Sequence, residues 1–200
     1  MKKLIYIRFL LIILILIIVT TAVAYAQVYK TEVIKQTKVG SPVQTQTASC
    51  PIPSGKISCG SKFTPINGCG HCGLAYESYM NNCTYDAINY AIDVEGNAGE
   101  SIYLPSINGK SIAWTFREEQ ACGSGSCQIY TGIDEQTKDQ YYIRFHHTEA
   151  GSGVSGKHTS GTIGARVCLT CKSNNHVHVE LGSGDPTGNQ YLDAAQYLCR

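Results

Sequence analysis

Ten cysteines restrict the folds open to this sequence more than any other feature. All of them lie between Cys50 and Cys199, and none falls in the apolar N-terminal segment. In an exported protein an even number of cysteines indicates a disulfide framework. Cys122 and Cys127 flank the short turn "GSGS", which predicts a local hairpin clamp, whereas spacing alone does not fix the other pairings. The disulfide candidates are Cys50, Cys59, Cys69, Cys72, Cys83, Cys122, Cys127, Cys168, Cys171 and Cys199.

The N-terminus predicts export. Lys2 and Lys3 precede a long apolar run, and "AYA" at residues 24–26 matches a cleavage site before Gln27, which is typical of a secretory signal peptide. The run is longer than most signal cores, so a retained transmembrane anchor formed by residues 4–23 is the alternative. In both cases the rest of the chain is secreted or extracytoplasmic.

The sequence divides into a leader (residues 1–26), a linker (27–49) and one domain (50–200). The linker is rich in Thr, Gln, Lys and Val and has no amphipathic period, which is typical of a spacer. The formal net charge is only +1, so the charge gives no reason to expect a nucleic-acid partner. A membrane contact is expected only through residues 4–23, if they are retained.

Residues 50–200 predict an all-β fold, an antiparallel sheet or sandwich reinforced by disulfides. Short apolar or alternating runs are separated by Gly, Asn, Ser and Pro, a pattern that indicates short strands. "AAQYL" near the end predicts one or two helical turns. The predicted strands are "SIYLP", "SIAWTF", "CQIYTGI", "YYIRFHH", "GTIGARVCL" and "HVHVEL".

The run "HVHVEL" carries two histidines on one strand. Alternation places His176, His178 and Glu180 on one face, where both imidazoles can reach one small site. His146 and His147 are adjacent in the sequence, so we expect them on opposite faces, with at most one joining that site.

Two Cys-x-x-Cys pairs allow other chemistry. "CGHC" (Cys69–Cys72) is the dithiol sequence of disulfide isomerases, but no βαβ pattern surrounds it, so a structural bridge is favoured over redox catalysis. Together with "CLTC" (Cys168–Cys171) it could form a four-cysteine zinc site, with His71 as a spare ligand. A lone loop histidine such as His71 is more often only solvated, and the exported context favours disulfides.

A series of motifs along residues 50–200 resembles the lysostaphin-type (LytM-like, β-lytic) zinc endopeptidases, which cut peptides of bacterial cell walls. The order of the motifs is kept, and the series is more specific than any one piece. The matching stretches are "PIPSGKISCGSKF", "AIDVEGNAGESIYLPSINGKSIAW", "YYIRFHHTE", "GKHTSGTIGARV" and "NNHVHVEL".

The resemblance implies one zinc ion and a role for each matching residue. His178, the second histidine of His-x-His, would ligate zinc, and Asp93 would be the carboxylate ligand. On its own, an aspartate in a run such as "NYAIDV" more often caps a turn. His147 and His176 would be the unligated catalytic pair that orients water and stabilises the tetrahedral intermediate.

One ligand position departs from the family pattern. The family has a ligand histidine four residues before the aspartate, and here that residue is Asn89, whose neutral amide oxygen is a poorer zinc ligand than imidazole. The chain must also bend between Asn89 and Asp93, because four residues of straight strand span about 13 Å.

Two function classes therefore stay open. The first, which we favour, is a zinc metalloendopeptidase for cell-wall peptides with an altered metal site that includes Asn89. The second is an inactive relative that binds wall peptide or a protein partner. A thiol-disulfide oxidoreductase is a remote third alternative.

Overall fold

The computed structural model covers the predicted domain with a few gaps. No helix in the described part of the chain is long and apolar enough to cross a bilayer. The predicted leader, Cys83 and the predicted linker up to residue 48 lie outside the described residues. The described residues are 49–53, 55–72, 86–123, 125–172, 175–188 and 190–200.

The described residues form short strands with two short helices, so the predicted all-β class is confirmed. Every predicted strand run contains an observed strand, and "AAQYL" contains the predicted helical turn. The predicted runs do not include the short elements at residues 57–59, 86–90, 92–95, 157–159 and 191–192. The elements are β1 (Ile57–Cys59), α2 (Asp86–Tyr90), β2 (Ile92–Glu95), β3 (Ser101–Tyr103), β4 (Ala113–Cys122), β5 (Gly125–Ile133), β6 (Gln140–Thr148), β7 (Lys157–Thr159), β8 (Ile163–Arg166), β9 (His176–Ser183), β10 (Tyr191–Leu192) and α3 (Ala194–Tyr197).

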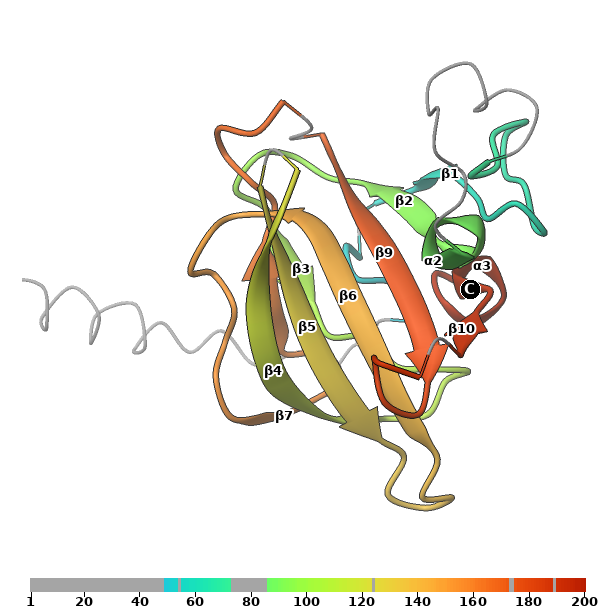
Figure 1. Ribbon diagram of the computed structural model, residues 1–200, viewed down its shortest axis with the longest axis vertical. Helices are drawn as coiled ribbons and strands as arrows, with labels where there is room; N and C mark the ends of the chain where they lie inside the picture. Colours follow the sequence, from blue (N-terminus) through green and yellow to red (C-terminus); the bar gives the residue numbers. More distant parts are fainter. Residues whose placement is uncertain (1–48, 54, 73–85, 124, 173–174, 189) are drawn as a thin grey trace, which may run out of the picture. The chain divides into compact units, whose positions relative to one another are not determined.

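The strands form one large antiparallel sheet and one small one. The large sheet has the order β1-β2-β9-β6-β5-β4-β7, and β10 pairs with β9 (Figure 1). Strands β4, β5 and β6 follow one another as hairpins, whereas β9 arrives late in the sequence and lies between β2 and β6. Strands β3 and β8 pair separately. This order brings residues near 93, 145 and 178 onto neighbouring strands.

Alternation along the central strands decides which side chains enter the core. Val177, Val179 and Leu181 of β9 are fully buried in it, together with Ile143 and Phe145 of β6. Burying one such side chain contributes roughly 1.5–3 kcal/mol. Because successive side chains of a strand point to opposite faces, the residues between these core positions lie on the other face of the sheet.

The predicted disulfide framework is confirmed in the described residues. Four bridges join Cys50 to Cys199, Cys59 to Cys69, Cys122 to Cys127 and Cys168 to Cys171. Cys72 is also disulfide-bonded, and the clamp across "GSGS" is the one expected.

The pairing also corrects the two alternatives for the Cys-x-x-Cys motifs. Cys69 bonds to Cys59, so Cys69 and Cys72 do not form the shared disulfide that dithiol redox catalysis requires. The four-cysteine zinc site is wrong for the same reason, because Cys168 and Cys171 bond to each other and disulfide sulfurs are not thiolate ligands.

Candidate metal centre

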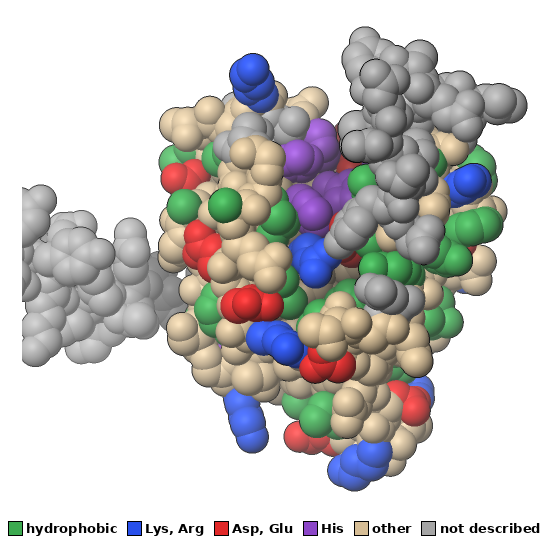
Figure 2. Space-filling model, in the orientation of Figure 1, with side chains coloured by type: hydrophobic (Ala, Val, Ile, Leu, Met, Phe, Trp, Pro, Cys, Tyr) green, Lys and Arg blue, Asp and Glu red, His purple; other side chains and the backbone are tan. Residues whose placement is uncertain are grey.

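The polar faces of β2, β9 and β6 meet in one row of side chains. In the antiparallel register Asp93 of β2 lies opposite His178 of β9, and His178 lies opposite His146 of β6. One step along, Arg144 lies opposite Glu180. Histidine side chains gather on this face of the molecule (Figure 2). Sheet pairing thus brings together residues that are up to 85 positions apart in the sequence.

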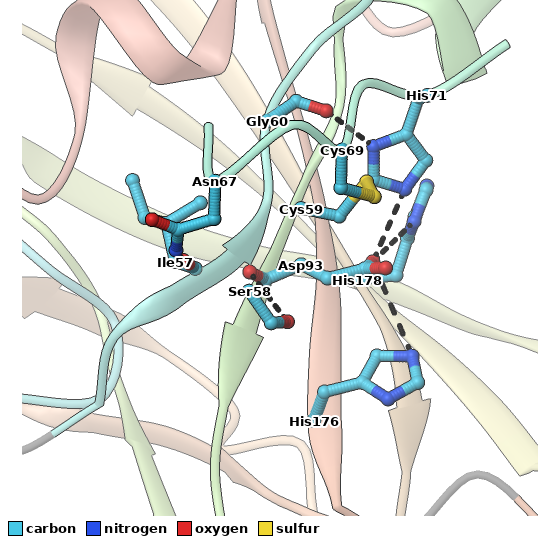
Figure 3. The surroundings of a disulfide bond; sticks show 10 residues. All are labelled: Ile57, Ser58, Cys59, Gly60, Asn67, Cys69, His71, Asp93, His176 and His178. Atoms are coloured by element: carbon cyan, nitrogen blue, oxygen red, sulfur yellow. Dashed lines mark hydrogen bonds and ion pairs between the residues drawn. A yellow bond between two sulfur atoms is a disulfide. The ribbon is translucent and has the colours of Figure 1, made fainter. Parts of the chain in front are cut away.

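One carboxylate oxygen is the centre of this cluster. Oδ1 of Asp93 lies 3.0 Å from Nδ1 of His178 and 3.2 Å from Nε2 of His71. Nε2 of His176 lies 4.0 Å from the same oxygen (Figure 3). Asp93 is only 6% exposed. Three imidazole rings therefore converge on one buried oxygen.

The burial and the contacts of Asp93 and His178 determine their charges. Burial opposes charge on both groups and is the largest single influence, but the hydrogen bonds and charges of their neighbours together outweigh it. The imidazoles of His178 and His71 hold the pKa of Asp93 far below its ordinary value. Asp93, with Glu180 behind it, raises the pKa of His178 to about 9. At pH 7 Asp93 is thus a carboxylate paired with a protonated His178, and a metal ion that binds His178 would displace that proton.

Glu180 supports the row from the far side of His178. Its Oε2 accepts a hydrogen bond of 2.7 Å from Arg144, and its Oε1 lies 3.0 Å from Nε2 of His146. Nε2 of His178 is 3.8 Å from the same Oε1. Burial would raise the pKa of Glu180, but these neighbouring imidazoles keep it well below its ordinary value. Glu180 is therefore a buried anion that orients two histidines.

The expected separation of His146 and His147 is wrong. The ring centroid of His146 lies 4.8 Å from that of His178, and the ring centroid of His147 lies 4.9 Å from that of His176. The β5–β6 register shifts near these residues, and His147 has a φ of 59°. Such a β-bulge breaks the two-residue alternation, so both histidines join the cluster.

The left-handed backbone of His147 yields a testable stability difference. We expect His147→Gly to be about 1 kcal/mol more stable than His147→Ala, because both variants remove the imidazole but only glycine adopts this φ without steric cost. Urea denaturation of the two metal-free variants measures the difference. Equal stabilities would mean that the strand relaxes and that the bulge is not fixed by its surroundings.

His147 and His176 differ from His178 in charge. Burial, followed by the nearby His176, lowers the pKa of His147 to about 4. Burial also lowers the pKa of His176. Both rings are therefore mainly neutral at pH 7, so each has one nitrogen that donates and one that accepts. Each ring can therefore accept a proton through one nitrogen or donate one through the other.

Asn89 lies at the end of helix α2, before the strand that carries Asp93. The expected bend is present, because the chain changes from helix at Tyr90 to strand at Ile92. The backbone carbonyl of Asn89 accepts a hydrogen bond from the Lys62 amide, while its side-chain Oδ1 is buried and has no hydrogen-bond partner. The side-chain oxygen of Asn89 is thus a buried acceptor that no described residue satisfies.

His71 is the site residue that sequence reasoning missed. It is fully buried, although a lone loop histidine was expected to be solvated. It reaches Asp93 because the bridge between Cys59 and Cys69 folds this loop against β2 (Figure 3). No periodicity marks His71, and its position between two cysteines was the one available signal.

A pocket of about 400 Å³ opens beside the cluster. His176 lines it, so the pocket adjoins the Asp93 centre. The other lining side chains are mostly polar and include both a cation, Lys56, and two carboxylates, Glu95 and Glu100. Such a surface can take a polar segment that carries both kinds of charge.

The donor atoms around Asp93 are of the types that bind zinc. Tetrahedral zinc with bonds of about 2.0–2.1 Å places neighbouring donor atoms about 3.3 Å apart. The distances from Oδ1 of Asp93 to the nearest nitrogens of His178 and His71 are 3.0 and 3.2 Å, close to that donor–donor distance. Imidazole nitrogens with one carboxylate oxygen form a donor set that zinc prefers. The sulfur of Cys59 is also near, but it is held in a disulfide.

Comparisons with known proteins give the following matches. No model of a protein family matches this sequence, and no curated protein does. Among solved structures, the antimicrobial peptidase lysostaphin from Staphylococcus simulans is similar at 16% identity and a TM-score of 0.46, over 73% of this chain and 50% of that chain. A structure of the lysostaphin catalytic domain crystallised without phosphate is similar at 16% identity and a TM-score of 0.40, over 70% of this chain and 86% of that one. This chain therefore spans half the length of the first of these proteins.

Proposed function

We propose that this protein is an extracytoplasmic zinc peptidase that hydrolyses cell-wall peptides. The observation that carries the proposal is the convergence of three histidine nitrogens within 4.0 Å of one buried oxygen of Asp93. The ordered series of motifs resembling lysostaphin-type endopeptidases supports the substrate class. The disulfide framework supports a location outside the cytoplasm.

The ligands common to the motif resemblance and the geometry are Asp93 and His178. A zinc ion at this place would polarise the scissile carbonyl and lower the pKa of water. Glu180 faces Nε2 of His178, which leaves Nδ1 directed at the centre. A carboxylate behind a ligating histidine fixes its ring and raises its basicity.

The proposed catalytic pair is His147 and His176. The two rings pack edge to face at 4.9 Å beside the centre, and both are mainly neutral at pH 7. One imidazole can take a proton from the attacking water, and the other can donate to the oxyanion that develops on the peptide carbonyl. A peptide segment bound in the pocket that His176 lines would lie next to this pair.

Peptide binding without cleavage is the alternative, and Asn89 is the residue that favours it. A site with a weak third ligand loses metal affinity and can retain the groove without the reaction. Hydrolysis and metal content, measured on the same preparation, separate the two functions.

The test uses the full chain, produced by an export route so that its disulfides form. We expect one equivalent of zinc in the purified protein, release of new amino groups from purified peptidoglycan, and loss of that release after dialysis against a chelator. Restoring zinc should restore hydrolysis. Binding of peptidoglycan without release of amines would favour the binding function. A protein that holds no zinc after equilibration with a zinc solution would exclude the metal site.

A further inference from the structure

We infer that His71, rather than Asn89, supplies the third protein ligand of the metal centre. This inference rests on the proposed zinc site and specifies its composition. The loop residue would take the place left by the missing ligand histidine four positions before Asp93. The centre would then hold two imidazoles and one carboxylate, which come from the 59–72 loop, β2 and β9.

The first argument is the shared oxygen. Nε2 of His71 and Nδ1 of His178 approach the same Oδ1 of Asp93, at 3.2 and 3.0 Å. Their rings meet edge to face, with centroids 4.8 Å apart. Both nitrogen-to-oxygen distances are compatible with ligand atoms that share one zinc ion with Asp93. His71 and His178 thus approach Asp93 in the same way. The motif pattern gave no indication of this, because His71 lies outside the matching stretches.

The second argument is the opposite side of the His71 ring. Its Nδ1 lies 2.8 Å from the backbone carbonyl oxygen of Gly60. A carbonyl oxygen only accepts, so Nδ1 carries the hydrogen and donates it. In the neutral ring Nε2 then carries the lone pair, and this lone pair would point at a metal ion bound beside Asp93. A ring whose second nitrogen donates to a backbone carbonyl is the usual arrangement of a metal-ligating histidine.

The third argument is the rigidity of the segment that holds His71. The Gly60 carbonyl oxygen also accepts the backbone amide of His71 at 2.9 Å, and the Gly60 amide donates to Cys69 at 3.1 Å. A side chain at Gly60 would collide with the Thr64 carbonyl oxygen. The bridge between Cys59 and Cys69 closes the same loop. The ring is therefore held in position before any metal arrives, which reduces the entropy cost of binding.

Asn89 is the rival ligand. Its buried Oδ1 has no hydrogen-bond partner, which is compatible with a metal contact, but a neutral amide oxygen binds zinc more weakly than imidazole. Nε2 of His71 lies 3.2 Å from the Asp93 carboxylate, which places His71 directly at the centre. The two assignments predict different numbers of imidazole ligands and different sensitive variants.

Zinc titration calorimetry on the oxidised full chain tests the inference. We expect His71→Ala to weaken zinc binding by at least about 100-fold, because it removes a direct ligand, and Asn89→Ala to change it less than about threefold. His158→Ala is the matched control, because Nε2 of His158 hydrogen-bonds with the Val154 and Ser155 carbonyls and not with the Asp93 cluster, and this variant should bind zinc like the wild type. Thermal melting of each metal-free variant checks that it is folded.

X-ray absorption of the zinc-loaded wild type gives a second measurement that needs no variant. We expect scattering from two imidazoles, whereas the Asn89 assignment gives one. Wild-type zinc binding with an unchanged His71→Ala variant, or a single imidazole in the spectrum, would overturn the inference and leave the proposed function standing. Failure of the wild type itself to bind zinc would overturn both.

Discussion

Replacing His178 with alanine is expected to abolish zinc binding and reduce peptide hydrolysis to background. His178 is the middle residue of the row across β2, β9 and β6, with Asp93 at 3.0 Å and Glu180 at 3.8 Å on its two sides. The substitution removes a ligand and also leaves the buried carboxylates of Asp93 and Glu180 facing a cavity. We expect a loss of zinc affinity of more than about 100-fold, measured by calorimetry.

His158→Ala again controls for the loss of an imidazole. Folding of His178→Ala is checked by near-ultraviolet circular dichroism, since Trp114 and Tyr130 are buried in the core. A folded His178→Ala protein that binds zinc as the wild type does would mean that this row is structural, and that the centre lies elsewhere.

Removing the bridge between Cys50 and Cys199 is expected to cause the largest stability loss of any single disulfide in the described residues. The two cysteines are 149 positions apart, whereas Cys122 and Cys127 are 5 apart. The loop-entropy relation gives about 5 kcal/mol for the long loop and about 2 kcal/mol for the short one. Both double serine variants replace two cysteines and remove one disulfide, so they form a matched pair.

Urea denaturation without reductant measures both variants against the wild type. We expect the Cys50→Ser/Cys199→Ser protein to unfold at a clearly lower urea concentration than Cys122→Ser/Cys127→Ser. Equal losses of unfolding free energy in the two variants would contradict the loop-entropy argument. The long bridge would then stabilise the protein mainly through local contacts in the folded state.

The strands and one half of the site could be predicted from the sequence. The alternation of "HVHVEL" correctly separates Val177 and Val179, which enter the core, from His176 and His178, which face the site. Two-residue alternation is a local property, so a single strand displays it. The assignment of Asp93 came from motif order, and the register now explains it, because Asp93 lies directly opposite His178.

The remaining part of the site depends on events that alternation does not encode. A single left-handed residue at His147 turns two adjacent histidines toward one cluster. The position of His71 depends on the disulfide between Cys59 and Cys69. The sequence is compatible with many disulfide connectivities, so it does not predict this one. Bulges and loop closures are set by tertiary contacts, so a strand pattern predicts neither.

The bridge between Cys50 and Cys199 also affects how the domain survives proteases. Ser49 donates to the Arg200 carbonyl at 2.8 Å, and the Cys199 amide donates to the Ser49 carbonyl at 3.0 Å, so the bridge lies where the two ends of the domain meet. Backbone and disulfide together form a closed ring, and one peptide-bond cleavage opens a ring without releasing a fragment. A domain nicked once between these cysteines keeps its full mass on a non-reducing gel and separates into two pieces only after reduction. Degradation therefore requires a second cut or a reductant.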